Sequence, residues 1–156
     1  MAIVSSTDDC MACRNSRPGD LPVRERILQT DHWRVAHTFN SGLPGWLVVL
    51  PTVHITALAE LTPEAAAELG PLLRDVSEAL HEVVGCVKTY VMLFAEAEGF
   101  SHVHFHVVPR MADQPAELRG PRIFGLLGLP PEECVTESER DRIGAEIRER
   151  LTRGAR

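Results

Sequence analysis

The chain has little lysine, few aromatic residues and no long apolar stretch. Lys88 is the only lysine among 16 basic residues, so an anion site would have to use arginine or histidine, and a Schiff base could form only at Lys88. No stretch approaches the roughly 20 apolar residues of a membrane span, and the N-terminus has no basic start followed by an apolar run. We therefore expect a cytoplasmic protein with no membrane partner.

The charge balance and the cysteines narrow the class of protein further. The net charge is -6 with a pI of about 5.6, which gives no general electrostatic footprint for nucleic acid. The length of 156 residues and the 44% hydrophobic content predict one globular domain spanning residues 1–156. In a reducing compartment the four cysteines are thiols or metal ligands, and Cys86 and Cys134, which have no partner by spacing, are interpreted as structural.

Several short apolar segments predict an antiparallel sheet. We expect strands at about 25–29 and 33–39, joined by a turn at Thr30 to His32, then at 46–50 and 87–94. A further strand carries three histidines and ends near Pro109. Trp33 and Trp46 are expected to pack inside rather than to stack on a ligand.

Two helices and two irregular segments complete an α+β fold. The long helix begins after the N-cap Thr62 and ends at Gly85, with Pro71 expected to kink it or split it near Ala67. Residues 1–20 form an N-terminal arm, loose except around a Cys-x-x-Cys pair. Residues 111–156 form an irregular segment and a C-terminal helix from about 137 to 151, opened by a capping box of Thr136 and Glu139. The narrow apolar stripe of that helix could dock on the body or on a second subunit.

The histidine segment, residues 102–108 (HVHFHVV), carries the chemistry. On a strand His102, His104 and His106 share one face, about 6 to 7 Å apart, and the apolar residues between them share the other. Core filling explains such a triplet poorly, because each buried imidazole needs a hydrogen-bond partner. The pattern favours either a metal site or a nucleophilic histidine whose neighbours hold an anionic substrate.

This segment resembles the His-x-His-x-His signature of the histidine triad superfamily of nucleotide hydrolases and transferases. Residues 44–54 (PGWLVVLPTVH) resemble that family's Gly-His-x-Leu-Val-x-Pro-x-x-His segment, and order and spacing agree over about residues 10 to 110. The resemblance is to the bacterial zinc-containing type, with residues 107–110 (VVPR) looking like the dinucleoside polyphosphate hydrolase branch. It implies an α+β fold, a homodimer and a nucleotide substrate.

The resemblance also implies roles for individual residues. His104 would attack the α-phosphorus of a dinucleoside polyphosphate, such as diadenosine tetraphosphate, and form a nucleotidyl-histidine. His106 would contact the phosphate oxygens. The other expected nucleotide- or phosphate-binding residues are His37 in the pocket, Thr38 and Asn40 near the ribose, Ser101 before the triad, and Arg110, which could instead pair with a surface acid.

Cys10-x-x-Cys13 is ambiguous when taken alone. The resemblance implies a structural zinc held by Cys10, Cys13, His54 and His102, a set of two thiolates and two imidazoles that satisfies tetrahedral zinc. The triad would then be divided, with His102 structural and the other two histidines chemical.

Two departures from the family pattern keep alternatives open. Trp46 stands where many relatives carry a histidine, and the acidic segment 96–101 (EAEGFS) replaces a Gly-Gln-Ser or Gly-Gln-Thr segment. The alternatives are a nucleoside phosphoramidate hydrolase, a zinc-stabilised nucleotide-binding module with little turnover, and a metalloenzyme whose catalytic zinc is held by all three triad histidines with Glu96 or Glu98 as the acid.

Overall fold

The computed structural model describes residues 7–154, and its centre is one antiparallel sheet. The strand order is β1-β2-β3-β5-β4, and every neighbouring pair is antiparallel, as predicted. The strands are β1 (Leu28–Gln29), β2 (Trp33–His37), β3 (Leu47–Pro51), β4 (Lys88–Leu93) and β5 (Phe105–Arg110). The α+β class predicted from the sequence is confirmed.

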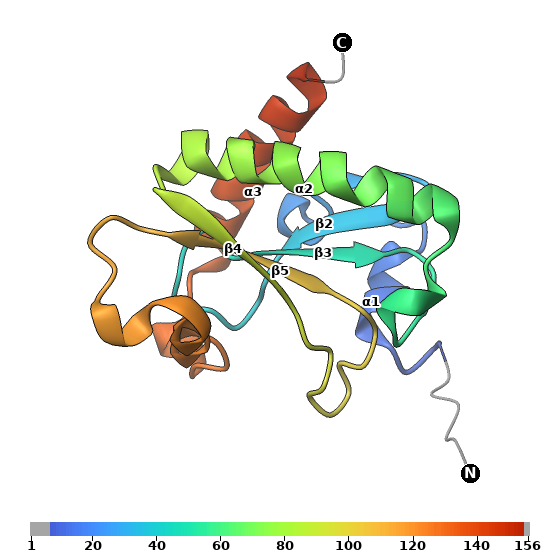
Figure 1. Cartoon of the computed structure of the whole chain (residues 1–156), viewed down its shortest axis with the longest axis horizontal. Coiled ribbons are helices and arrows are strands. Elements are labelled where there is room, and N and C mark those ends of the chain that lie inside the picture. The colour runs from blue at the N-terminus through green and yellow to red at the C-terminus, as the bar shows by residue number, and fades with distance from the viewer. Residues whose placement is uncertain (1–6, 155–156) are drawn as a thin grey trace.

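Residues 7–154 also form three α-helices and five short 3₁₀ segments. The long helices α2 (Pro63–Val84) and α3 (Glu137–Arg153) lie on one face, and α1 (Met11–Ser16) lies near the N-terminal end of the chain (Figure 1). The 3₁₀ segments are Val23–Glu25, Leu58–Glu60, Ala116–Leu118, Gly120–Leu126 and Pro131–Glu133. Within residues 7–154, no helix has both the length and the apolar character needed to cross a bilayer.

The main core lies between the sheet and the two long helices. Trp33 is fully buried, its ring packs against Phe105 with centroids 6.1 Å apart, and its indole N–H donates to the Ala65 carbonyl of α2 over 2.9 Å. The same cluster holds the helix residues Val76 and Leu80, both with no exposed surface. The apolar members of the histidine segment, Val103, Phe105 and Val107, also belong to it. The alternation read from the sequence therefore sends these side chains into the core.

Helix α2 has the predicted caps but is not split. The Thr62 hydroxyl accepts from the Ala65 amide, and Gly85 ends the helix in the left-handed region at φ 70°. Pro71 lies inside the continuous helix. It removes one bond to the Ala67 carbonyl, but both residues are exposed, so water can satisfy that carbonyl. The expected split near Ala67 is therefore wrong.

Helix α3 docks on the body of its own chain. Ile143 and Ile147 have no exposed surface and belong to the main core. Thr136 caps the helix by accepting from the Glu139 amide, as predicted. The Glu139 carboxylate does not complete the capping box, because Arg142 binds it instead at 2.7 and 2.9 Å.

The first predicted strand and the histidine strand are both shorter than expected. Residues 23–25 form a 3₁₀ turn, and only Leu28 and Gln29 pair with β2. Strand β5 begins at Phe105, so His102 and His104 precede the ladder. The Val103 amide instead donates to the Ile55 carbonyl over 2.9 Å. This contact draws the segment toward the loop after β3 and gives the three histidines different surroundings.

Gly45 connects the loop before β3 to the core. Its φ of 88° lies in the left-handed region, and its amide donates to the His37 ring over 2.9 Å. A Cβ there would lie 3.0 Å from Val84 and 3.2 Å from Leu80. Glycine is therefore required at this position both by backbone conformation and by the close approach of α2.

Candidate functional site

A cavity of about 430 Å³ lies on the sheet face opposite the two long helices. The small or apolar side chains Ala36, Val48 and Leu50 form part of its wall, and His104 and His106 line it. Because strand side chains alternate between faces, the residues between these wall positions enter the main core. His102 also lines this cavity, so all three triad histidines border one half-open, mostly apolar space.

Four of the five phenylalanines in the chain line this cavity, although aromatic residues make up only 5% of the sequence. Phe39 and Phe100 stack with centroids 6.2 Å apart, and Phe94 packs edge-on against Phe124 at 5.5 Å. Phe124 comes from the 3₁₀ segment Gly120–Leu126, the second of the three that follow β5. This cluster was not predicted from the sequence, where its signal was the concentration of a rare residue type near the motifs.

His104 has one ring nitrogen held and the other free. Its Nδ1 lies 2.8 Å from the His102 carbonyl, which can only accept, so Nδ1 carries the proton. In the neutral ring Nε2 then carries the lone pair, and it has no hydrogen-bond partner among residues 7–154. A neutral histidine with a free lone pair beside a cavity is the arrangement that nucleophilic attack requires.

His106 is held by Trp46. The indole N–H of Trp46 lies 3.0 Å from Nδ1 of His106, and both side chains are buried. Burial, and secondarily the neighbouring His104, lower the pKa of His106 to about 4. The sequence suggested that replacing histidine by Trp46 removes a polar neighbour from the triad. In the structure Trp46 supplies a hydrogen bond as well as packing.

The other predicted phosphate-side residues have mixed placements. Thr38 and Asn40 line the cavity, and the Thr38 hydroxyl donates to the Asn40 amide oxygen over 3.2 Å. His37 also lines it, but its Nδ1 bonds the Thr38 carbonyl and its Nε2 accepts from Gly45, so neither nitrogen is free. Burial lowers the pKa of His37 to about 4, and the Thr38 carbonyl opposes that shift.

Ser101 and Arg110 do not line the cavity. Ser101 is exposed, and Arg110 is the last residue of β5, paired in register with Lys88 on β4. In the acidic segment before the triad, Glu96 lines the cavity and Glu98 does not. This geometry brings neither Ser101 nor Arg110 to the two histidines, so their roles stay predictions.

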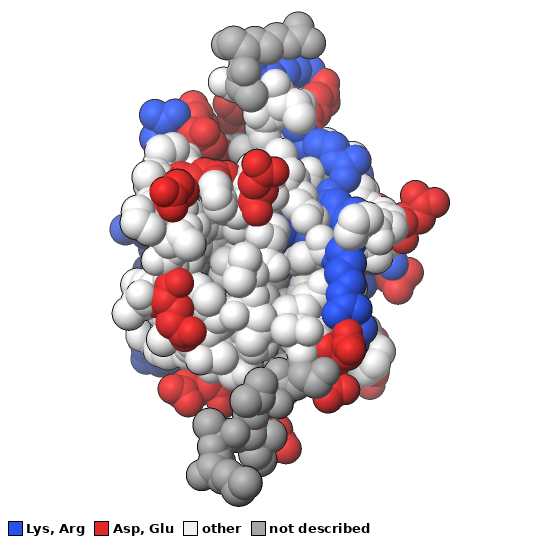
Figure 2. Space-filling view, turned by 90° about the vertical axis from the view of Figure 1, so that its right-hand side faces the viewer, with Lys and Arg blue, Asp and Glu red and all other residues white. Residues whose placement is uncertain are grey.

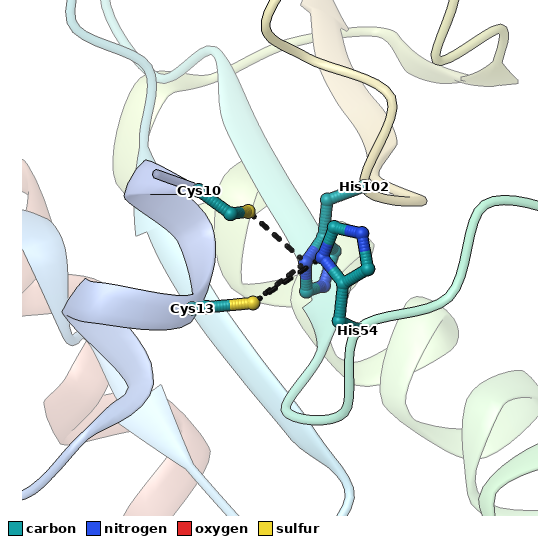
Figure 3. A group of neighbouring side chains, drawn as sticks. All are labelled: Cys10, Cys13, His54 and His102. Carbon is teal, nitrogen blue, oxygen red and sulfur yellow. Dashed lines mark hydrogen bonds between the residues drawn. The ribbon is translucent and has the colours of Figure 1, made fainter. Parts of the chain in front are cut away.

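Cys10, Cys13, His54 and His102 form one cluster (Figure 3). Each offers one ligand atom, and all four atoms lie within 4.8 Å of one another. Cys10 precedes α1 and Cys13 lies within it, His54 follows β3, and His102 precedes β5. Three parts of the chain that are distant in sequence therefore meet at this point.

The distances within the cluster fit tetrahedral zinc. Zn–S and Zn–N bond lengths place neighbouring sulfur and nitrogen ligands about 3.5 Å apart. The Sγ atoms of Cys10 and Cys13 each lie 3.5 Å from Nδ1 of His102, and Cys13 lies 3.3 Å from Nδ1 of His54. Two sulfur and two nitrogen donors also close the site to water, so the arrangement is that of the structural zinc predicted from the sequence.

The second ring nitrogen of His102 supports the same assignment. Nε2 donates to the Pro51 carbonyl over 2.8 Å, which leaves Nδ1 unprotonated and directed at the cysteines. Burial and then Cys10 raise the pKa of the Cys13 thiol to about 11. At neutral pH this side chain is therefore a thiol unless a bound cation stabilises the thiolate, which is the form that ligates zinc.

Arg34 fastens α1 to the sheet and was missed by the sequence analysis. It is 3% exposed, and its guanidinium donates to the Ala12 and Glu25 carbonyls and to the Ser16 hydroxyl. Burial lowers its pKa to about 10, so it remains a cation at neutral pH. A lone charged residue within the apolar run of β2 was the available signal, but only the structure shows what it binds.

The charges on the surface are mixed in sign. In the space-filling view a band of Lys and Arg side chains follows one side of the face shown, with acidic side chains around it and an uncharged area between them (Figure 2). The cavity itself has one basic side chain among its described lining residues, Arg34, and three of its nitrogens already bond protein groups. No surplus of free cationic groups therefore lines it.

The sequence profile described as "HIT domain" matches residues 23–113. Among solved structures, the chain is similar to a zinc-bound histidine triad family protein from Mycobacterium smegmatis, with 18% identity and a TM-score of 0.66 over 96% of this chain and 99% of that one. A Hit-like protein from Bartonella henselae, described as involved in cell-cycle regulation, has 21% identity and a TM-score of 0.63 over 89% and 91%.

A histidine triad protein from Sinorhizobium meliloti has 24% identity and a TM-score of 0.67 over 81% of this chain and 88% of that one. At these identities the likeness shows the fold. No curated protein sequence matches the chain.

Proposed function

The chain belongs to the HIT domain family, and from this premise we propose that it is a nucleotide hydrolase or nucleotidyl transferase with His104 as its nucleophile. The observation that carries the proposal is the hydrogen bond from Nδ1 of His104 to the His102 carbonyl. It leaves the Nε2 lone pair beside the cavity.

The proposed reaction has two steps. Nε2 of His104 attacks the α-phosphorus, a P–N bond forms, and the bond from phosphorus to the leaving group breaks with its electron pair going to the leaving group. Water, or another acceptor in a transfer reaction, then attacks the same phosphorus and returns the pair to Nε2. His106 and backbone donors would stabilise the charge that grows on the phosphoryl oxygens in both steps.

Dinucleoside polyphosphates are our first candidate substrates, as expected from residues 107–110. Nucleoside phosphoramidates are the second, and a specific observation favours them: among residues 7–154, four phenylalanines but a single arginine and no lysine line the cavity. An apolar leaving group suits such a lining better than a chain of charged phosphates does. Thr38 and Asn40, which line the cavity, would lie near the ribose.

We propose that Cys10, Cys13, His54 and His102 hold a structural zinc in this chain, in keeping with the zinc-bound relative. When bound, the ion joins α1, the loop after β3 and the start of the histidine segment. The division of the triad would follow: His102 serves this join through Nδ1, while Nε2 of His104 and Nε2 of His106 have no partner within residues 7–154.

We also propose a homodimer in the cytoplasm. Strand β4 is an edge strand, and Val87 beside it and Val91 within it are 49% and 44% exposed. An apolar edge of this kind favours pairing with a second copy. Light scattering should give twice the chain mass, and Val91→Lys should shift it toward the monomer. None of the four cysteines, all of which lie within residues 7–154, forms a disulfide, which suits a reducing compartment.

The function is tested by supplying a diadenosine polyphosphate and an adenosine phosphoramidate to purified protein, with and without chelator. His104→Gly should abolish turnover, and added imidazole should restore part of it by replacing the missing ring. Mass spectrometry of quenched wild type should find one nucleotidyl adduct on His104. His32→Ala is the matched control, since His32 pairs with Glu68 at the surface.

Three results decide between the candidates. Turnover that resists brief chelation and is lost in His104→Gly supports the proposal. Nucleotide binding without turnover favours a binding module, and immediate, metal-reversible loss of activity favours a catalytic metal. An adduct on a different residue would contradict the assignment of His104.

A further inference from the structure

Trp46 and His106 are joined by a hydrogen bond between two neighbouring strands. Trp46 directly precedes β3, and Val48 of β3 stands opposite His106 of β5. Trp46 is therefore two residues from the position facing His106, on the same face of the sheet. The indole N–H reaches Nδ1 of His106 at 3.0 Å, with neither side chain more than 6% exposed.

The chemistry of the two rings fixes the direction of this bond. An indole N–H can only donate, so Nδ1 of His106 must be the acceptor and must carry the lone pair. The proton of the neutral imidazole then lies on Nε2. This atom has no hydrogen-bond partner within residues 7–154, and His106 lines the cavity, so Nε2–H is free to donate there.

His104 has the opposite arrangement. Its Nδ1–H is given to the His102 carbonyl, so its Nε2 carries the lone pair. The two rings lie with centroids 4.9 Å apart and nearly perpendicular, at 76°. The cavity is therefore lined side by side by one acceptor nitrogen and one donor nitrogen.

We propose that Trp46 is a positioning residue that holds His106 as an Nε2–H donor, so that His106 gives a hydrogen bond to an oxygen of the phosphoryl group attacked by His104. The hydrogen-bonding part of this inference stands on the geometry alone, and its catalytic part rests on the proposed function. It makes the two histidines non-interchangeable. A lone pair at Nε2 of His106 would repel the same phosphoryl oxygen.

The surroundings of His106 support a neutral donor rather than an imidazolium. Trp46 and Phe124 pack edge-on to its ring with centroids 5.7 and 5.1 Å away, and Phe124 also packs on Trp46 at 5.5 Å. These apolar neighbours shield most of the ring from water, and this burial, with a smaller effect of His104, lowers the pKa of His106 to about 4. Stabilisation of phosphoryl charge by His106 is therefore by one directed hydrogen bond.

The test compares two buried tryptophans, each of which donates a hydrogen bond through its indole N–H. Trp46→Phe removes the indole donor and keeps an aromatic ring. Trp33→Phe is the matched control, because Trp33 is equally buried and also donates its indole N–H, but to Ala65 in the core. Ring ¹⁵N chemical shifts of His106 are measured in wild type and both variants, together with kcat and KM for the better of the two nucleotide substrates.

We expect wild type and Trp33→Phe to show His106 with the proton on Nε2. Trp46→Phe should lose the shift of a hydrogen-bonded Nδ1 and should lower kcat about tenfold with a smaller change in KM, because the missing contact strengthens as charge grows. A protonated Nδ1 in wild type would overturn the proposal. So would Trp46→Phe behaving like Trp33→Phe in both shifts and kinetics.

Two further measurements keep the outcomes separate. If Trp46→Phe does not fold, wild type still decides, since a scalar coupling between the Trp46 indole nitrogen and Nδ1 of His106 must be present and its absence overturns the bond. If wild type shows the predicted tautomer but no turnover, the role of Trp46 in holding His106 is supported and the proposed function fails. AMP titration then reports whether the Nε2 proton shift responds to a bound phosphate, as the inference requires.

Discussion

His102 and His106 lie four residues apart in one short segment, and their surroundings differ in what is left for a ligand. On the metal side, His102 gives Nε2–H to Pro51 and turns Nδ1 to two cysteines, so the site is closed by protein groups. On the cavity side, His104 and His106 each have one nitrogen held and one free. The partner of the second ring nitrogen, more than the histidine itself, therefore decides whether a triad histidine has a structural or a chemical role.

The largest effect should come from breaking the metal side. In Cys10→Ser combined with Cys13→Ser, we expect loss of about one zinc per chain and a fall of about 5 kcal/mol or more in unfolding free energy. Elemental analysis and denaturant unfolding measure the two. Cys134→Ser is the control, because Cys134 is a half-buried thiol outside the cluster. A full zinc complement in the double variant would show that these thiols are not ligands.

The second prediction compares substitutions of His102 and His104 by their effects on turnover, zinc content and stability. His104→Ala should lower turnover about 10³-fold or more while zinc content and stability stay close to wild type. His102→Ala should lose zinc, stability and turnover together, because it removes a ligand at the cluster. Elemental analysis, thermal unfolding and steady-state kinetics of the pair provide the comparison. Equal losses of zinc in both variants would contradict the assignment of His102, and not His104, as a zinc ligand.

The third prediction concerns the attachment of α1. Arg34→Lys cannot reproduce the three contacts of the guanidinium, and the freed carbonyls of Ala12 and Glu25 would be left partly unsatisfied. We expect a loss of about 3 kcal/mol and faster zinc release to a chelator. Arg119→Lys is the control, since Arg119 also bonds a backbone carbonyl but lies outside α1. An unchanged rate of zinc release in Arg34→Lys would show that the attachment of α1 by Arg34 does not affect zinc binding.

The smallest effect is a pH dependence from the cavity side. His37 has a folded pKa of about 4 against 6.5 unfolded, so the folded state binds fewer protons. Its stabilising contribution is complete above pH 6.5 and is lost as pH falls toward 4, with about 2 kcal/mol lost by pH 5. The unfolding free energy of wild type should therefore fall more steeply between pH 7 and 5 than that of His37→Asn. Parallel slopes would contradict the assignment.

The sequence predicted the parts of the fold that depend on local pattern. Alternation placed Val103, Phe105 and Val107 in the core, and the caps at Thr62 and Gly85 follow from residue type alone. The metal ligands came from a family resemblance, and the structure brings all four together. Local pattern failed at Pro71, because only the exposure of its face explains why the helix continues.

The contacts that distinguish the zinc cluster from the cavity could not be predicted from local sequence pattern. The Trp46 to His106 bond depends on the register between β3 and β5, which no single segment encodes. Arg34 binds carbonyls 9 and 22 residues away, and Phe124 reaches His106 from the irregular segment after β5. These are tertiary contacts. They determine the protonation and the placement of side chains that the sequence motifs identify only by residue type.

Gly45 gives the site a limit on the sequences it can accept. Its amide holds His37, it precedes Trp46, and a Cβ would strike Val84 and Leu80. Any replacement would push the loop away from α2 and carry the indole of Trp46 with it. In a complete substitution library, position 45 should therefore be depleted for every side chain, although the exposed Pro44 beside it tolerates change. A position that accepts no side chain thus restricts mutational drift of the cavity, although it contributes no chemical group to it.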